Sequence, residues 1–313
     1  MSRPAPVLHP QRPTRLVYLG TPAMAVPPLR AIVDAGFDVA LVVTRPDTRR
    51  GRGNAQQPSP VKVAAIERGL PVSHDVDDAL AAGADLGVVV AYGRLIKPHV
   101  LDAIPMVNLH FSLLPRWRGA APVERALLAG DSETGVAVMG VEDALDTGFI
   151  YAERTIPIKP TDTAHDLRIR LVAEGSELLV ESLTSGLPTP RPQVGEPTYA
   201  AKILPDELRI DWTHPAGSID RLVRLGGAFT TFRGKRLKIW GGAITDTERV
   251  PDPELLPERN ATPGALVGEM VVCGNNSALT LREVQPEGRA RVPFVAWRNG
   301  AQPVEGERFG TEL

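Results

Sequence analysis

The chain has 313 residues, of which 43% are hydrophobic and 23% are charged, and its formal net charge is −2. This is the composition of an ordinary globular protein, and the length suits two domains of about 100–200 residues each. The single cysteine, Cys273, excludes an intrachain disulfide and a cysteine-rich zinc site, and no apolar run approaches the ~20 residues of a membrane-spanning helix.

Residues 1–14 are rich in proline and lack the apolar core of a signal peptide, so we expect a disordered leader and a cytoplasmic location. Beyond them, short apolar runs alternate with helical patterns. Strands are predicted at 15–20, 38–44, 70–73, 85–92, 106–110 and 135–141, and helices at 25–35, 61–68, 122–129 and 161–184. This alternation favours an α/β domain over residues 15–187 with a Rossmann-like, open and mostly parallel sheet, which binds ligands at the carboxyl ends of its strands.

The composition changes after residue 187. Prolines at 188, 190, 192, 197 and 205 predict a linker over 188–206, because proline fixes φ and removes backbone donors. Strands are then predicted at 228–232, 236–240, 265–272 and 278–284, with turns at Arg233-Gly-Lys235 and Gly274-Asn-Asn-Ser277. We therefore expect a C-terminal domain over 207–313 that is a small, OB-like β-barrel. The acidic stretch 246–258 is interpreted as a surface insertion.

Two polar residues at the end of a predicted strand are candidates for chemistry. Asn108 and His110 are two positions apart, so their side chains share one face of the strand. An asparagine amide can hold a developing oxyanion, and a histidine can act as a general base or acid near neutral pH. Asp146, in a turn that ends in glycine, could orient the histidine, and Asp143 is a rival for that role. Taken alone, the same residues could be a core histidine, a strand cap and a turn former.

The residues belong to a longer pattern. Asn108-x-His110-x-Ser112-x-Leu114-Pro115, followed by Arg118-Gly119 and Leu145-Asp146-Thr147-Gly148, resembles the folate-dependent formyltransferase family. The resemblance implies that Asn108, His110 and Asp146 are catalytic and that 10-formyltetrahydrofolate is the formyl donor. It implies folate contacts from Ser112, Leu113, Leu114, Pro115, Tyr92, Gly93, Leu95 and Ile96. No metal is required, and the absence of a G-x-G-x-x-G run after the first strand argues against a dinucleotide cofactor.

The family's acceptors include glycinamide ribonucleotide, sugar-nucleotide amines and methionyl-tRNA. The first is disfavoured because its enzymes resemble only the N-terminal ~200 residues. Residues 44–53, followed by Pro58–Lys62, resemble the inserted loop of methionyl-tRNA formyltransferases. Four arginines, Arg45, Arg49, Arg50 and Arg52, fall within this loop and suit phosphate contacts. A solvated charged loop is the alternative.

The predicted C-terminal domain contains a second basic segment. Arg209-Ile-Asp-Trp212 and Lys235-Arg-Leu-Lys-Ile-Trp240 resemble the same family's C-terminal domain, and seven basic residues between 209 and 240 face only Asp211 and Asp220. We expect Lys235, Arg236 and Lys238 to bind tRNA. The sequence thus predicts a monomeric enzyme that formylates methionyl initiator tRNA and has no membrane partner. A formyltransferase acting on a sugar-nucleotide amine and a non-catalytic folate-binding module are the alternatives.

Overall fold

The structure is a computed structural model that describes residues 12–49, 56–245, 262–304 and 306–310. It divides into two compact units. The first contains the described residues up to Val123 together with Ser132–Ile158 and Asp166–Ala201, and the second contains Glu124–Asp131, Lys159–His165 and the described residues from Lys202 onward. No helix among the described residues is both long enough and apolar enough to cross a membrane.

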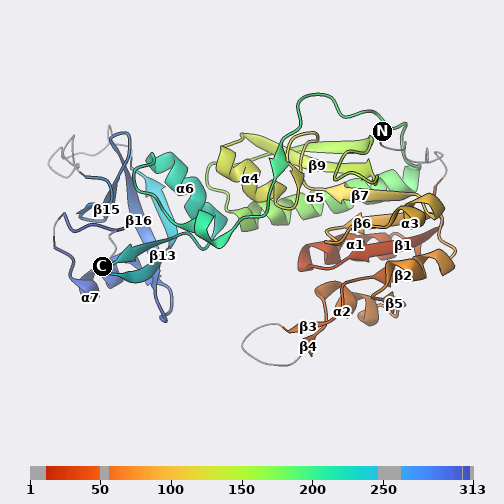
Figure 1. The fold of residues 1–313 in the computed structure, drawn as a ribbon, viewed down its shortest axis with the longest axis horizontal. Coiled ribbons are helices and arrows are strands. Elements are labelled where there is room, and N and C mark those ends of the chain that lie inside the picture. The colour runs from red at the N-terminus through yellow and green to blue at the C-terminus, as the bar shows by residue number, and fades with distance from the viewer. Residues whose placement is uncertain (1–11, 50–55, 246–261, 305, 311–313) are drawn as a thin grey trace. The chain divides into compact units, whose positions relative to one another are not determined.

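The first unit is built on a seven-stranded sheet with the strand order β10-β9-β7-β6-β1-β2-β5 (Figure 1). The strands are β1 (Arg15–Gly20), β2 (Asp38–Val43), β5 (Val72–Ser73), β6 (Leu86–Val90), β7 (Met106–His110), β9 (Glu133–Gly140) and β10 (Ile150–Pro157). The five strands from β7 to β5 run parallel, and β9 and β10 are antiparallel additions. The chain extends from β1 first to one side and then to the other, which creates the topological switch of a Rossmann-like sheet and confirms the predicted fold.

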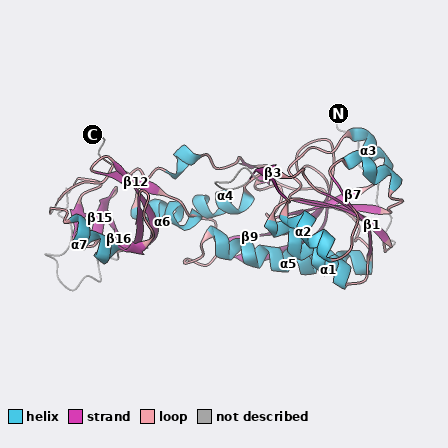
Figure 2. Cartoon of the chain, turned by 90° about the horizontal axis from the view of Figure 1, so that it is seen from below, coloured by secondary structure: helices cyan, strands magenta, loops and turns pink. Residues whose placement is uncertain are grey.

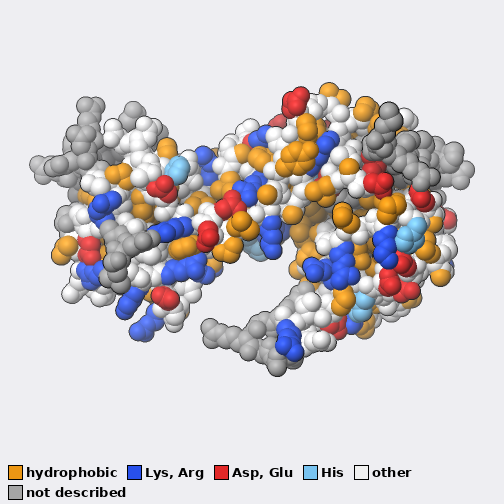
Figure 3. Space-filling view, viewed as in Figure 1, with side chains coloured by type: hydrophobic (Ala, Val, Ile, Leu, Met, Phe, Trp, Pro, Cys, Tyr) orange, Lys and Arg blue, Asp and Glu red, His pale blue; other side chains and the backbone are white. Residues whose placement is uncertain are grey.

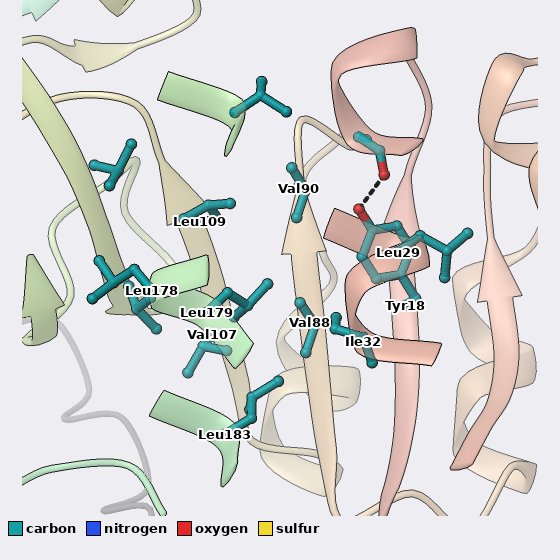
Figure 4. Packing of buried hydrophobic residues seen from close by; sticks show 14 of the residues in the cluster. Tyr18, Leu29, Ile32, Val88, Val90, Val107, Leu109, Leu178, Leu179 and Leu183 are labelled. Atoms are coloured by element: carbon teal, nitrogen blue, oxygen red, sulfur yellow. Dashed lines mark hydrogen bonds between the residues drawn. The ribbon is translucent and has the colours of Figure 1, made fainter. Parts of the chain in front are cut away.

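Helices cover both faces of this sheet (Figure 2). On one face α1 (Val26–Asp34) and α5 (Ala164–Ser185) pack against the sheet, and on the other lie α3 (Pro98–Ala103) and the 3-10 helix η2 (Val76–Ala81). Figure 4 shows the α1 and α5 side, where the contacting residues are Tyr18, Leu29, Ile32, Val88, Val90, Val107, Leu109, Leu178, Leu179 and Leu183. The period of two in each strand sends alternate residues to the two cores, which explains why these strands read as continuous apolar runs.

The remaining elements of the first unit are short. They are α2 (Pro60–Glu67), the 3-10 helix η1 (Ala23–Ala25), the hairpin of β3 (Thr48–Arg49) and β4 (Gln56–Gln57), and the parallel pair β8 (Arg118–Gly119) and β11 (Tyr199–Ala200). Helix α2 begins where Ser59 accepts a hydrogen bond from the Lys62 amide and Pro60 supplies a preset φ at the first helical position.

The second unit is formed around an antiparallel sheet with the strand order β12-β13-β16-β15-β14, and β17 pairs with β16. Its elements are α4 (Pro122–Ala129, in this unit from Glu124), η3 (Pro205–Leu208), α6 (Ala216–Leu225), β12 (Phe229–Phe232), β13 (Lys235–Ile244), β14 (Leu266–Val267), β15 (Met270–Cys273), β16 (Ser277–Pro286), β17 (Val292–Pro293) and α7 (Phe294–Ala301). The single strand predicted at 265–272 is two strands, because Gly268, with φ of 60°, makes a turn between them.

The sheet of the second unit is closed by its C-terminal segment. The Leu266 amide donates to the Glu307 carbonyl and the Phe309 amide donates to the Gly264 carbonyl, while the Gly310 amide donates to Thr231 in β12. The segment therefore joins the β14 edge to the β12 edge. Phe309 is 2% exposed and its ring packs against Trp212, Phe232 and Trp297 in the core.

The predicted domain boundaries of 15–187, 188–206 and 207–313 stay a prediction. Residues 188–201 of the predicted linker lie with the first unit, where β11 pairs with β8. Most of the leader prediction and all of the 246–258 interpretation fall outside the described residues. Of the last leader residues, Thr14 donates to the Asp85 carboxylate through its amide and its hydroxyl.

Candidate active site

Strand β7 positions two of the three predicted catalytic residues. Val107 and Leu109 point into the core beneath α5, so the alternate residues Asn108 and His110 lie on the opposite face. Asn108 is half-buried and pairs with Met139 of β9, and His110 is 5% exposed. Both residues are at the carboxyl end of a parallel strand, next to the end of β6, where the topology of the sheet predicts a ligand site.

The imidazole of His110 is held by the loop that follows β7. Its Nε2 lies 3.0 Å from the carbonyl oxygen of Trp117. Because a carbonyl can only accept, Nε2 carries the proton in this arrangement and Nδ1 is left with the lone pair in the neutral ring. The Ser112 hydroxyl donates to the Arg116 carbonyl at 2.6 Å, so the same loop is tied back on itself.

Asp146 approaches the other nitrogen of this ring. Its Oδ2 lies 3.7 Å from His110 Nδ1 and accepts a hydrogen bond of 2.7 Å from the Gly119 amide. The Asp146 side chain is 12% exposed, whereas Asp143 is an exposed residue of the same turn. The geometry therefore favours Asp146 over its rival as the partner of His110.

A glycine holds the turn that carries Asp146. Asp146 has a φ of 53°, in the left-handed region that aspartate tolerates better than most residues. Two positions later, Gly148 passes so close to the neighbouring strand that an added Cβ would lie 1.9 Å from the Gly140 carbonyl oxygen. Only glycine fits there, which gives the glycine of the Leu145-Asp-Thr-Gly148 motif a physical reason.

The residues expected to bind folate fall into two groups. Ser112, Leu114 and Pro115 are buried, Leu113 is half-buried, and Leu114 packs with Ala137, Met139 and Ile150. In the loop after β6, Tyr92 is 2% exposed and burial raises the pKa of its hydroxyl, while Gly93 is exposed and has a φ of 76°. Leu95 is 80% exposed and Ile96 is half-buried. The second group thus presents an apolar side chain to solvent close to the end of β6.

The sequence does not indicate two residues, Thr198 and Gln193, that hold the loop after β7 and the turn of Asp146. The Thr198 hydroxyl accepts from the Trp117 amide at 2.9 Å, and the Gln193 amide contacts both Arg118 and the backbone of the Asp146 turn. Both residues are half-buried in a segment whose other side chains are mostly exposed. Its prolines indicate a linker, and the contacts of Thr198 and Gln193 become evident only in the fold.

Residues on both sides of the predicted basic loop are held by side-chain contacts. Asp47 forms an ion pair of 2.8 Å with Lys62 of α2, and the buried hydroxyls of Thr44 and Ser59 are 2.7 Å apart. The hairpin of β3 and β4 extends from these residues, which form the base of the loop. Arg45 and Arg49 are exposed, whereas Arg50 and Arg52 lie outside the described residues.

The basic residues of the second unit divide by their contacts. Arg221, Arg224 and Arg233 make hydrogen bonds with Leu128, Asp220 and Glu307, respectively, within the unit. Lys235 and Arg236 are exposed and Lys238 is half-buried, and Arg236 lies 3.6 Å from the ring of Phe229. Figure 3 shows Lys and Arg side chains on the visible face of this unit. Two of the predicted trio, Lys235 and Arg236, are thus accessible, and Lys238 is partly so.

Comparison with known proteins agrees with both units. Residues 14–183 match the family described as "Formyl transferase", and residues 202–302 match "Formyl transferase, C-terminal domain". A protein of Frankia casuarinae named "Methionyl-tRNA formyltransferase" is 44% identical over 95% of this chain and 96% of its own length. A Thermobifida fusca protein of the same name is 42% identical over 95% of this chain and 100% of its own length.

A solved structure has the same fold at low sequence identity. It is the N-formyltransferase of Helicobacter canadensis, described in complex with folinic acid and dTDP-3-aminofucose, and it covers 87% of this chain and 99% of its own at a TM-score of 0.63. Its identity to this chain is 18%, so the likeness concerns the fold alone. From the matches to both family regions and the relatives that span nearly the whole chain, the chain belongs to the formyl transferase family.

Proposed function

We propose that this enzyme transfers the formyl group of 10-formyltetrahydrofolate to the α-amino group of methionyl initiator tRNA. The observation that carries the proposal is that identity of 42–44% to proteins named methionyl-tRNA formyltransferase extends over 95% of the chain and so includes both units. The cytoplasmic location and the monomeric state predicted from the sequence belong to this proposal and await their own tests.

The residues beside β6 suit the flat ring system of a folate. Leu95 offers an exposed apolar side chain, Ile96 is half-buried, and Gly93 has no side chain to obstruct a ligand. Apolar walls with a few placed polar groups are typical of small-molecule sites. We infer that these residues and Ser112–Pro115 bind the formyl donor. When bound, the donor supplies an activated formyl group on nitrogen.

His110 is suited to take the proton from the attacking amine. Its Nε2–H is engaged by the Trp117 carbonyl, which leaves Nδ1 to accept a proton. The Asp146 carboxylate, 3.7 Å from Nδ1, stabilises the imidazolium that results, because opposite charges attract strongly in a site with little water. Asp146 is itself held by the Gly119 amide.

Asn108 is suited to stabilise the oxygen of the formyl carbonyl as negative charge develops on it. Its side chain lies on the same face of β7 as His110 and offers an amide N–H donor. One such donor is typically worth roughly 3–4 kcal/mol of activation free energy. Asn108 would thus stabilise the charge on the formyl oxygen, and the proton that His110 takes from the amine would pass to N10 of the folate as the bond from N10 to the formyl carbon breaks and tetrahydrofolate leaves.

The acceptor is assigned to tRNA from the basic surfaces. Arg45 and Arg49 are exposed near the loop base of the first unit, and Lys235 and Arg236 are exposed on the second. Exposed cations bind phosphates and release counterions, so affinity for a nucleic acid falls as salt rises, with a slope of about 0.7–0.9 per contact. A sugar nucleotide carries far fewer phosphates and gives a shallow dependence.

The test is an acceptor panel with labelled 10-formyltetrahydrofolate. It compares Met-tRNA from initiator and elongator, a UDP-amino sugar and glycinamide ribonucleotide at three salt concentrations. We expect kcat/KM to be highest for the initiator Met-tRNA and to fall steeply with salt. Preferential formylation of the amino sugar, or a Met-tRNA reaction insensitive to salt, would overturn the proposed acceptor. No transfer to any amine would favour a folate-binding module instead.

A further inference from the structure

The Gln193 side chain makes four hydrogen bonds near the candidate active site, two with backbone carbonyls of the Asp146 turn and two with the Arg118 guanidinium. Its Nε2 lies 2.9 Å from the carbonyl oxygen of Asp146 and 2.9 Å from that of Gly148. Its Oε1 accepts from Arg118, at 3.0 Å from Nε and 2.6 Å from Nη2. The side chain is half-buried although most of its sequence neighbours are exposed.

These contacts fix the orientation of the amide. A guanidinium can only donate and the two backbone carbonyls can only accept, so the oxygen of the amide must face Arg118 and its nitrogen must face the Asp146 turn. Both N–H groups and the carbonyl oxygen of the side chain are then satisfied. A glutamate of equal length would keep the contact with Arg118 and set a negatively charged oxygen against two carbonyl oxygens.

The contacts of Gln193 link the two segments that hold the Asp146 carboxylate. One end of the amide holds the backbone of Asp146 itself, in its left-handed conformation, and the other holds the side chain of Arg118. The residue after Arg118 is Gly119, whose amide donates to Asp146 Oδ2. Gln193 therefore connects the turn that carries the Asp146 carboxylate with the strand whose amide donates to it. The Oδ2 atom of that carboxylate lies 3.7 Å from His110 Nδ1.

We propose that Gln193 is a positioning residue that holds the Asp146 carboxylate against His110, an inference that rests on the roles proposed above for these two residues. Its hydrogen bonds are made to Arg118 and to the backbone of the Asp146 turn, so it acts on the reaction through Asp146. The proline-rich segment 188–201 therefore contributes to the reaction, because it supplies Gln193.

The segment stays docked without this amide. Arg191 exchanges two backbone hydrogen bonds with Ile150, at 2.8 and 2.9 Å. The Thr198 carbonyl accepts from the Arg118 amide, and the Ala200 carbonyl accepts from the Ala120 amide. A Gln193→Ala variant should therefore fold, and its defect should be local. Gln193→Met fills a similar volume with no hydrogen bonds and serves as the second variant if the alanine variant proves unstable.

The experiment is a double-mutant cycle with Asp146→Ala, measured by single turnover with labelled donor. Gln193→Ala removes two hydrogen bonds from the Asp146 turn and two from Arg118. The loss of the two that hold the turn corresponds to a roughly 10- to 100-fold effect, so we expect kcat to fall by about that factor with KM changed less than about threefold. In the Asp146→Ala background the same substitution should change kcat less than about twofold, because the group that it positions is gone. Glu196→Ala, at an exposed site in the same segment, is the control and should keep the wild-type kcat.

A merely structural role predicts a different pattern. The loss from Gln193→Ala would then be equal in both backgrounds, and that result, or an unchanged kcat, would overturn the inference. The second readout is the ¹⁵N spectrum of the His110 ring, which needs no turnover. It should change in Gln193→Ala and Gln193→Glu and not in Glu196→Ala. If the wild type fails to formylate Met-tRNA, the proposed function is wrong, and the spectrum still decides whether Gln193 positions Asp146 at His110.

Discussion

His110 and Trp117 are joined by a hydrogen bond of 3.0 Å from the ring Nε2 to the backbone carbonyl. The carbonyl accepts only, so it selects the neutral tautomer that has its proton on Nε2. The chain itself therefore determines which nitrogen of the ring faces Asp146 and is available to a substrate amine.

We predict that ¹⁵N spectra of histidine-labelled protein show neutral His110 as the Nε2–H tautomer. His74 provides an internal control, because its Nδ1 lies 3.1 Å from the Thr44 carbonyl and its Nε2 lies 3.4 Å from Lys62 Nζ. Its neutral ring should carry the proton on Nδ1, the opposite tautomer. Resonances are assigned with His110→Gln and His74→Gln. A His110 ring protonated on Nδ1 would mean that Nε2, not Nδ1, serves the reaction.

We predict that Asp146→Ala and His110→Ala each lower kcat by about 10²–10⁴-fold, the usual contribution of a positioned acid or base. Folate binding, measured by fluorescence or calorimetry, should be nearly unchanged, since the loss lies in the chemical step. Asp143→Ala is the matched control, because Asp143 is exposed in the same turn, and its kcat should stay within about threefold of wild type. An equal loss of kcat in Asp143→Ala would show that the assignment of the functional carboxylate to Asp146 is wrong.

We predict that Gly148→Ala is destabilising and nearly inactive. Its Cβ would lie 1.9 Å from the Gly140 carbonyl oxygen, so the turn must move and take the Asp146 carboxylate with it. Overpacking of this kind costs about 1–3 kcal/mol of unfolding free energy. Gly300→Ala is the control, because it lies in α7 with nothing within 4 Å of the added Cβ. That variant should gain about 0.5–1 kcal/mol in chemical denaturation and keep full activity.

We predict that replacing Arg49, Arg50 and Arg52 with alanine raises KM for Met-tRNA and leaves the melting temperature nearly unchanged. The hairpin base is secured by Asp47 and Lys62 and Arg49 is exposed, so we expect the arginines of this loop to add little stability, within about 0.5 kcal/mol. Lysine at the same positions should recover part of the loss if charge suffices, and little if paired contacts to phosphate matter. Unaltered formylation at physiological salt would remove the loop from the argument for tRNA.

We predict that the Cys273 thiol is inert in the native protein. Burial raises its pKa to about 12 from an ordinary value near 9, so the reactive thiolate is scarce at neutral pH. Ellman's reagent should label it only on unfolding. Above pH 9 the unfolded thiol ionises and the folded one does not, so stability falls with rising pH by up to about 1.4 kcal/mol per unit. Cys273→Ala should lack this contribution when unfolding is compared at pH 8 and pH 10.

The strands of the first unit were predictable because their chemistry is local. Arg15–Gly20 and Met106–His110 are bounded as predicted, since continuous apolar runs of that length suit strands buried on both faces. The alternation in β7 was enough to place Asn108 and His110 on one face. Strand β10 was not predicted, because its residues follow a turn and their exposure alternates at the edge of the sheet.

The rest of the candidate site depends on contacts between distant parts of the chain. Asp146 and Asp143 are nearly equivalent in sequence, and only the approach of Gly119 and His110 distinguishes them. Gln193 lies 47 residues from Asp146 in a proline-rich segment, where composition indicates a linker. A side chain whose role is to bridge two backbone segments leaves no periodic signal, so its discovery required the fold.

The closure of the second sheet by residues 306–310 has a consequence for biosynthesis. The β12 edge cannot acquire its Gly310 partner, and Trp212 cannot acquire the Phe309 ring, until residue 310 has emerged from the ribosome. Domains fold as units during synthesis and pairings between distant residues form slowly. The first unit, whose last strand partner is complete by Ala200, can therefore finish folding first, and the sheet of the second unit is completed only after residue 310 has emerged.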